Sequence, residues 1–277
     1  MKTTTLAAVI LFSGFAASAA AQTTQAPPAT EPFTPTVGQA GKDVVWVPTP
    51  QALVEKMLDM AKVTPQDFVM DLGSGDGRNI IAAAKRGAKA TGVEFNHDMV
   101  ELSRKQAAQA GVADKATFIE GDMYEADISE ATVLALFLLP ENLRKLTPKF
   151  LDLKPGTRIV ANTFGISGWD AVESVRIEGD CRSWCEAMLY IIPAKVAGTW
   201  TMPDGQLMLQ QDFQRISGTM AAGQETRTID SGSIRGSEIT FTIGPRVYTG
   251  RVVGDLIDGT VTSDGRQEKF NARRMDR

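Results

Sequence analysis

The stretch FVMDLGSGDGRNIIAAAKRG, from Phe68 to Gly87, decides the fold. It begins with a short apolar run, continues through glycines at alternate positions, and ends in a helix-forming run closed by a glycine. Glycines between a buried strand and a helix let the backbone turn sharply and approach a ligand closely. The stretch therefore predicts a strand, a ligand-binding loop and a helix whose free N–H groups face that loop.

The same alternation of strand and helix surrounds this stretch. Upstream, Leu53, Val54, Met57 and Leu58 form one face of a helix for which Thr49 is the expected N-cap. Downstream, the pattern predicts strands at 89–95, 116–122, 132–139 and 157–164, with helices at 98–110 and 141–153. Strands separated by such helices pair in parallel. The predicted fold is a doubly wound, Rossmann-like α/β domain with a mostly parallel sheet.

The pattern changes in the last third of the chain. Runs at 172–179 and 188–194 predict an antiparallel edge to the first sheet. Beyond them, short alternating runs divided by Gly, Asp-Gly and Pro indicate a meander of about eight strands, which predicts a small antiparallel β sandwich or barrel. We therefore expect a first domain at 44–196 and a C-terminal β domain at 197–277.

The N-terminus has the layout of a secretory signal peptide. Lys2 precedes an apolar run from Leu6 to Ala17, and small residues then lead to a cleavage site before Gln22. Residues 1–21 are therefore the predicted signal peptide, and 22–43, rich in Pro, Thr and Ala, the predicted flexible linker. The expected location is outside the cytosol, in a bacterial periplasm. An uncleaved signal would instead leave the protein cytoplasmic or membrane-tethered, and no later stretch predicts a membrane span.

Composition narrows the classes of partner and site. The chain of 277 residues is 43% hydrophobic and 22% charged, as in ordinary globular proteins, and its net charge of -4 predicts no nucleic-acid partner. Cys181 and Cys185 form an even pair that predicts a disulfide if the chain is exported, or two free thiols if it is not. No metal site is expected, because the only histidine, His97, is far from this pair.

Acidic residues around the glycine loop indicate the charge of its ligand. The spacing is G-x-G-x-G instead of the G-x-G-x-x-G of dinucleotide loops; Asp71 lies two residues before the first glycine, and Asp76 lies between the last two. Two carboxylates repel a pyrophosphate and attract a cation. S-adenosyl-L-methionine carries both a sulfonium and an ammonium group, so we predict it as the cofactor.

Two more acids follow the next two strands. Glu94 can accept hydrogen bonds from both ribose hydroxyls, as in NAD-binding proteins, so this residue alone does not separate the two cofactors. Asp122 can accept from an adenine amino group. The carboxyl ends of parallel strands share one edge of the sheet, where ligands bind. The predicted cofactor-binding residues are Asp71, Gly73, Ser74, Gly75, Asp76, Gly77, Glu94, Phe95, Asn96, Asp122 and Met123.

Five motifs carry a family resemblance: VPTP at 47–50, DLGSGDGR at 71–78, GVEFN at 92–96, FLLP at 137–140 and TFGISGW at 163–169. They resemble class I S-adenosylmethionine-dependent methyltransferases, and more narrowly the small lysine methyltransferases related to the mitochondrial ATP synthase c-subunit enzyme. The resemblance implies a seven-stranded sheet, cofactor contacts at the motif acids and glycines, and a protein lysine as substrate. It also places the substrate side at Thr49, Leu139, Pro140 and Trp169.

One departure from related amino-group methyltransferases limits the acceptor. Many have an Asn/Asp-Pro-Pro-Tyr motif after the fourth strand, where this chain has LLPEN at 138–142. We therefore do not expect glutamine, asparagine or adenine as acceptors, but a lysine or another small nucleophile. The alternative function is an exported, non-catalytic cofactor- or ligand-binding protein that retains the methyltransferase fold. Phe164 can wall a channel for a lysine stem or lie in the core, and we favour the core. VAGTW at 196–200 and NARR at 271–274 resemble the Gly-x-Trp start and the closing Arg of lipocalin-like barrels, and this resemblance implies that Trp200 stacks on Arg273 or Arg274.

Overall fold

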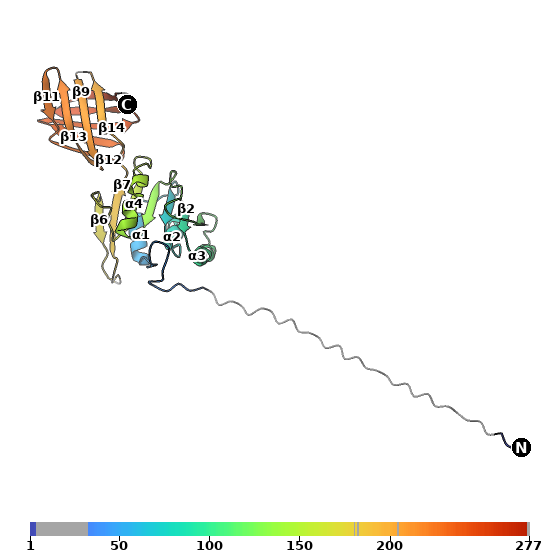
Figure 1. The fold of residues 1–277 in the computed structure, drawn as a ribbon. Helices are drawn as coiled ribbons and strands as arrows, with labels where there is room; N and C mark the ends of the chain where they lie inside the picture. The colour runs from blue at the N-terminus through green and yellow to red at the C-terminus, as the bar shows by residue number, and fades with distance from the viewer. Residues whose placement is uncertain (4–32, 180, 182, 204, 276–277) are drawn as a thin grey trace. The chain divides into compact units, whose positions relative to one another are not determined.

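The computed structural model describes residues 1–3, 33–179, 181, 183–203 and 205–275. The chain divides into two compact units, Met1–Phe33 and Thr34–Arg277, and the second contains every helix and strand of the described residues (Figure 1). The predicted signal peptide, apart from its first three residues, and the predicted linker as far as residue 32 lie outside the described residues. No helix in the described part of the chain is long and apolar enough to cross a bilayer.

The first part of this unit is one sheet with interspersed helices. Its elements are α1 (Gln51–Met60), β1 (Phe68–Leu72), α2 (Arg78–Lys85), β2 (Lys89–Glu94), α3 (His97–Gln109), β3 (Ala116–Glu120), β4 (Val133–Leu136), α4 (Pro140–Phe150), β5 (Arg158–Asn162), β6 (Glu173–Arg176) and β7 (Glu186–Ile191). The strand order is β3-β2-β1-β4-β5-β7-β6. Only β7 runs antiparallel to its neighbours. The predicted doubly wound, mostly parallel seven-stranded sheet is confirmed.

Helices cover both faces of the sheet. Successive residues of a strand point to opposite faces, so Val69 joins the core that contains the apolar faces of α1, α2 and α3, whereas Met70 joins the core that contains α4. Burial on both faces explains the nearly continuous apolar runs of the central strands. At the start of α1 the N-cap is Pro50 instead of Thr49, because the Thr49 hydroxyl accepts a hydrogen bond from Asn162 instead.

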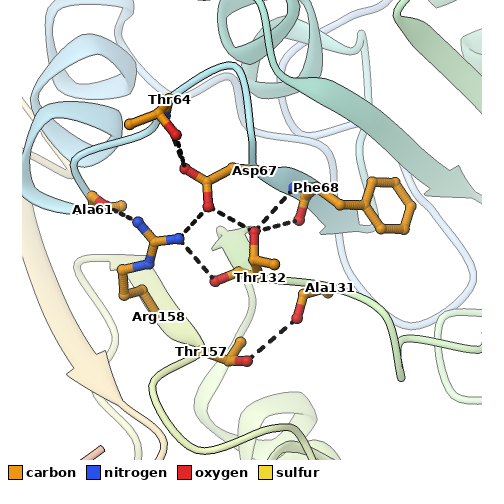
Figure 2. Close-up of polar contacts among 8 residues, drawn as sticks. All are labelled: Ala61, Thr64, Asp67, Phe68, Ala131, Thr132, Thr157 and Arg158. Atoms are coloured by element: carbon orange, nitrogen blue, oxygen red, sulfur yellow. Dashed lines mark hydrogen bonds and ion pairs between the residues drawn. The ribbon is translucent and has the colours of Figure 1, made fainter.

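A polar network joins the N-terminal ends of β1, β4 and β5 (Figure 2). Asp67 pairs with Arg158 and accepts hydrogen bonds from the Thr64 N–H at 2.8 Å and the Thr132 hydroxyl at 2.8 Å. Burial opposes ionisation of this carboxyl, but these hydrogen bonds and the Arg158 charge lower its pKa below the usual range. The network lies at the end of the strands opposite the glycine loop, so it fixes strand positions without entering the pocket.

The second part of the unit is an antiparallel barrel. Its strands are β8 (Gly198–Met202), β9 (Gly205–Asp212), β10 (Arg215–Ala222), β11 (Glu225–Thr228), β12 (Ser231–Arg235), β13 (Glu238–Ile243), β14 (Arg246–Val253), β15 (Leu256–Ser263) and β16 (Arg266–Arg274). Pairing runs from β10 through β12 to β16, then to β8 and β9, and the β9–β10 pair closes the ring, while β11 extends β10. The prediction left sandwich and barrel open, and the structure is a barrel of eight closed strands.

Aromatic side chains fill the barrel interior. Phe241 stacks on Tyr248 with ring centroids 4.7 Å apart, and Phe270 meets Tyr248 edge to face. Trp200 is fully buried, and the Arg274 guanidinium lies 4.3 Å from its ring centroid. An eight-stranded barrel is just wide enough for side chains to fill. The interior is therefore a packed core.

Candidate active site

A cavity of about 180 Å³ lies at the carboxyl edge of the parallel strands. Its lining comes from the loop after β1, the end of β2, the segments after β3, β4 and β5, and residues 39–49. Ligands of open α/β sheets bind at this edge. The cavity is therefore the candidate active site.

Residues 39–49, here called the strap, extend along one side of the cavity. An isolated bridge joins Ala40 to Val45, and the Trp46 N–H donates to the Gln39 carbonyl at 2.9 Å. The structure therefore differs from the predicted flexible linker at 22–43, because its last residues are held by backbone hydrogen bonds. Such bonds leave no apolar period in the sequence, so composition alone indicated a linker.

The glycine loop has the left-handed backbone that its sequence suggested. Gly73, Gly75 and Gly77 have φ angles of +75°, +55° and +79°. At Gly75 a Cβ would lie 2.7 Å from Trp46 Nε1, so the strap packs directly against the loop there. Gly77 is the N-cap of α2 and faces Phe118 and Ser103, so packing between elements requires a glycine there, and its cofactor contact stays a prediction.

Replacing Gly77 with alanine is expected to lower the free energy of unfolding by about 2 to 4 kcal/mol. The added Cβ would lie 2.6 Å from the Phe118 ring in a backbone conformation that L-residues avoid. Gly111→Ala is the matched control, because Gly111 has φ +70° and nothing within 4 Å of its Cβ position. Urea unfolding measures both variants. Equal losses in the two variants would contradict the steric part of this prediction.

Asp71 lies at the floor of the cavity and is only 3% exposed. Its Oδ2 accepts from Asn79 Nδ2 at 2.9 Å, whereas its Oδ1 is buried without a hydrogen-bond partner among the described residues. The same holds for Ser74 Oγ and Asn79 Oδ1, which belong to residues lining the same cavity. Buried polar atoms usually have partners. Acceptor atoms gathered here fit a ligand that donates hydrogen bonds, such as an ammonium group.

Burial, together with the nearby charges of Glu94 and Asp76 and against the hydrogen bond from Asn79, raises the pKa of Asp71 to about 7. A carboxyl with this pKa is half ionised near neutral pH. A cationic ligand would favour its ionised form. The electrostatics therefore fit the positive charge of S-adenosylmethionine.

Glu94 ends β2 and holds the loop after β1. Its Oε2 accepts from the Gly75 N–H at 2.9 Å, and its Oε1 accepts from the Asn96 N–H at 2.9 Å. Glu94 also lines the cavity. Each carboxylate oxygen retains a lone pair, so the same side chain fits two ribose hydroxyls.

Asp122, Phe95 and Met123 line the part of the cavity nearest β3. The Asp122 carboxylate pairs with Lys42 of the strap and accepts from the Tyr124 N–H at 2.9 Å. The hydrogen bond from Lys42 is the main cause that lowers the pKa of Asp122. Lys42 Nζ also lies 5.0 Å from the Phe95 ring centroid. An acceptor carboxylate beside an exposed aromatic face suits a purine with an amino group.

Two predicted cofactor-binding residues have structural partners. Asp76 makes a two-point ion pair with Arg78, whose Nη1 donates to the Thr49 carbonyl at 2.6 Å. Asn96 is the N-cap of α3, because its Oδ1 accepts from the Met99 N–H. These contacts hold the strap and the helix, and because both residues also line the cavity, their cofactor contacts stay predictions.

The predicted substrate residues separate into two groups. Thr49 and Leu139 line the cavity, whereas Pro140 begins α4 beside it. Trp169 lies elsewhere: it is 4% exposed and stacks on Phe213 of the β9–β10 turn with centroids 5.0 Å apart. The structure thus places Trp169 outside the cavity lining, with Phe213 of the barrel against its ring.

On the acceptor side of the cavity, the sequence reasoning weighed Phe164 as a channel wall but missed Phe137 and Trp184 beside it. Phe137, Phe164 and Trp184 line it together, and Phe164 therefore belongs to the site as well as to the edge of the core. Trp184 follows Cys181 in the segment CRSWC and precedes Cys185, with which Cys181 forms a disulfide. The only available signal was an aromatic residue between two cysteines, which does not indicate what its ring contacts.

Comparisons with known proteins agree with this geometry. A family model described as the ANTKMT methyltransferase domain matches residues 71–173. A protein-lysine N-methyltransferase of Saccharolobus islandicus (strain REY15A) is 45% identical over 138 residues, covering 49% of this chain and 86% of the relative. The chain belongs to the ANTKMT methyltransferase family. It is an S-adenosylmethionine-dependent methyltransferase, as predicted.

Two further relatives of this methyltransferase are informative. The ATP synthase c-subunit lysine N-methyltransferase of Mus musculus is 30% identical over 184 residues, covering 66% of this chain and 72% of the relative. A crystal structure described as an RNA methyltransferase from Salinibacter ruber, in complex with S-adenosyl-L-homocysteine, has 43% identity and a TM-score of 0.51 and covers 54% of this chain and 96% of its own. The family match at residues 71–173 lies within the part of the chain that forms the first sheet and does not include the barrel.

Proposed function

We propose that this methyltransferase transfers a methyl group to the amine of a lysine side chain in a protein. The observation that carries the proposal is the aromatic and apolar acceptor side of the cavity, where Phe137, Leu139, Phe164 and Trp184 line the same cavity as Asp71. Such a lining suits the four-carbon stem of lysine, with its amine directed toward the cofactor. The relatives from Saccharolobus islandicus and Mus musculus are both lysine N-methyltransferases by name, which supports a lysine acceptor.

A nucleic-acid base fits the acceptor side less well. Enzymes that modify a base bind its edge through hydrogen bonds. After β4 this chain presents Phe137, Leu138 and Leu139, none of which has a polar side-chain atom. The net charge of -4 also disfavours a polyanion. The lysine acceptor is therefore the better-supported function.

Methyl transfer requires the protein to align the two reactants more than it requires acid–base catalysis. When bound, the sulfonium supplies a methyl carbon already activated for displacement. Asp71 would hold the ammonium end, Glu94 the ribose and Asp122 the adenine amine, while the aromatic side aligns a neutral lysine amine for in-line attack. The amine lone pair would form the new N–C bond while the bond from sulfur to the methyl group breaks with its electron pair on sulfur, which leaves S-adenosylhomocysteine. The extra proton of the methylated amine would then pass to solvent.

The test is to incubate the full chain with deuterium-labelled S-adenosylmethionine and, separately, with a proteome extract and total RNA. We expect label on lysine residues, located by mass spectrometry of the digested proteins, and none on RNA nucleosides. Glu94→Ala serves as the inactive control. Label on nucleosides without label on lysine would overturn the proposal.

We also propose that the chain acts after export to an oxidising compartment, a bacterial periplasm. The signal-like N-terminus supports this, and so does the disulfide between Cys181 and Cys185, since such bonds persist in oxidising compartments. Fusing residues 1–40 to a reporter that is active only outside the cytosol tests it. A silent reporter, with an authentic signal peptide as positive control, would overturn the export proposal.

A further inference from the structure

The segment between β6 and β7 brings an indole ring to the methyl-acceptor side of the cavity. Trp184 lines the cavity although it is 41% exposed, and it lies between Cys181 and Cys185 in sequence. Cys185 is 2% exposed and its carbonyl accepts from the Ile177 N–H at 2.9 Å, so one end of the segment is fixed to the sheet. The disulfide attaches Cys181 to this fixed end.

Trp184 adopts a backbone conformation that its residue type disfavours. Its φ angle is +60°, in the left-handed region, where L-residues other than glycine are uncommon. Such a conformation persists only where the surroundings impose it, and it is concentrated at functional sites. Here the covalent closure between Cys181 and Cys185 is the constraint nearest to Trp184 in the chain. This backbone therefore depends on an intact disulfide.

The three rings form a connected cluster, here called the aromatic triad of Phe137, Phe164 and Trp184. The Trp184 centroid lies 5.5 Å from that of Phe164 and 6.0 Å from that of Phe137, and the two Phe centroids are 6.3 Å apart. Phe137 follows β4 and Phe164 follows β5, so two rings come from the sheet. The third ring comes from the segment closed by Cys181 and Cys185, here called the disulfide segment. Aromatic faces attract ammonium groups and pack against methylene chains.

We propose that Trp184 determines acceptor specificity by completing an aromatic passage for an amine-bearing chain, and that the Cys181–Cys185 disulfide holds Trp184 in that position. The inference rests on the proposed transfer to a lysine-type amine. Phe137 and Phe164 stay in place without the disulfide, because β4 and β5 hold them. The disulfide segment therefore makes acceptor binding sensitive to oxidation while cofactor binding stays unchanged.

Reduction by a dithiol is the step that would release Trp184. A dithiothreitol thiolate attacks one sulfur of the Cys181–Cys185 bond, which breaks and leaves a mixed disulfide between the protein and the reagent. The second dithiothreitol thiol then attacks this mixed disulfide and displaces the protein sulfur as a thiolate. Two electrons and two protons pass from dithiothreitol to the protein. The products are the Cys181 and Cys185 thiols and the cyclic disulfide of the reagent.

The experiment uses the full chain saturated with S-adenosyl-L-homocysteine and titrated with Nα-acetyl-lysine amide, with NMR detection of binding. We expect Trp184→Ala to weaken binding of this blocked lysine about tenfold and Trp184→Phe to restore most of it. The Cys181→Ser/Cys185→Ser variant is expected to weaken binding as well, and dithiothreitol to do the same to the parent protein. Dithiothreitol should have no further effect on the double-serine variant, which is its control.

Two readouts separate this inference from a merely structural effect and from the proposed function. In Trp184→Ala, the affinity for S-adenosyl-L-homocysteine should stay within about twofold of the parent value. The thermal unfolding midpoint should stay within a few degrees of it, because an exposed ring contributes little to the core. Equal binding of the blocked lysine by parent and Trp184→Ala, or none by the parent, would overturn the inference. Lysine methylation that Trp184→Ala retains in full would also overturn it while leaving the proposed function intact.

Discussion

Glu94→Ala is expected to weaken binding of S-adenosylmethionine about a hundredfold or more. The carboxylate fits both ribose hydroxyls and also fixes the loop after β1 through the Gly75 and Asn96 N–H groups. Each hydrogen bond to a charged group contributes about 1.5–3 kcal/mol, so loss of two corresponds to about 3 kcal/mol or more. At about 1.4 kcal/mol for each tenfold change in affinity, this gives the expected loss.

Calorimetric titration of the cofactor into the full chain measures this loss. Glu120→Ala is the matched control, because Glu120 lies opposite Glu94 in the β2–β3 register and is exposed with His97 as its partner. Its replacement removes the same charge from the neighbouring strand end without touching the cavity. If both variants bind the cofactor equally tightly, Glu94 does not hold the ribose.

Cofactor affinity is expected to fall up to about tenfold per pH unit below pH 7 and to level off above it. The pKa of Asp71 in the unliganded site is about 7, and a bound cation favours the ionised carboxylate, so binding releases a proton when the pH is below that value. Asp71→Asn should bind more weakly at pH 8 and lose this part of the pH dependence. Titrations of both proteins at pH 6, 7 and 8 separate the contribution of Asp71 from the titration of the ligand itself.

The same pKa has an effect of predictable sign on stability. The folded-state pKa lies above the unfolded value near 3.8, so the folded protein binds the proton more tightly than the unfolded chain does. Ionisation of Asp71 therefore destabilises the unliganded fold progressively from about pH 4 to pH 7. Asp71→Asn should remove that penalty and unfold at a higher urea concentration at pH 8. Identical pH profiles for parent and variant, in binding and in unfolding, would contradict a raised pKa at Asp71.

The first sheet and the centre of the site were predictable because parallel strands obey strong geometric rules. Asp71 lies near the end of β1, Glu94 ends β2 and Asp122 follows β3, and the carboxyl ends of parallel strands necessarily meet at one edge. The glycine spacing and the acids then indicated the charge of the ligand. Each of these inferences used only the order of residues along a strand and its following turn.

The remainder depends on contacts between distant segments. Trp169 follows β5 by only a few residues, but Phe213 of the β9–β10 turn decides that its ring is covered. Trp184 faces Phe137 and Phe164 because of its place in the disulfide segment, which no local period encodes. Closure of the barrel likewise depends on which strand pairs with β9. The alternation of apolar and polar residues does not encode that pairing, so it predicted a sandwich and a barrel equally well.

The pairing of β8 with β16 has a consequence for the order of folding. Trp200 and Thr201 on β8 face Arg274 and Arg273 on β16, and the Met275 N–H donates to the Thr199 carbonyl. The first strand of the barrel, β8, therefore gains its backbone hydrogen-bond partners on this edge only when the last strand, β16, is in place. The first sheet has no such requirement and can form while β16 is still being synthesised, whereas the barrel depends on contacts of long sequence separation, which form slowly. During that interval one edge of β8 has no partner strand, so a chaperone that binds extended segments would bind to β8.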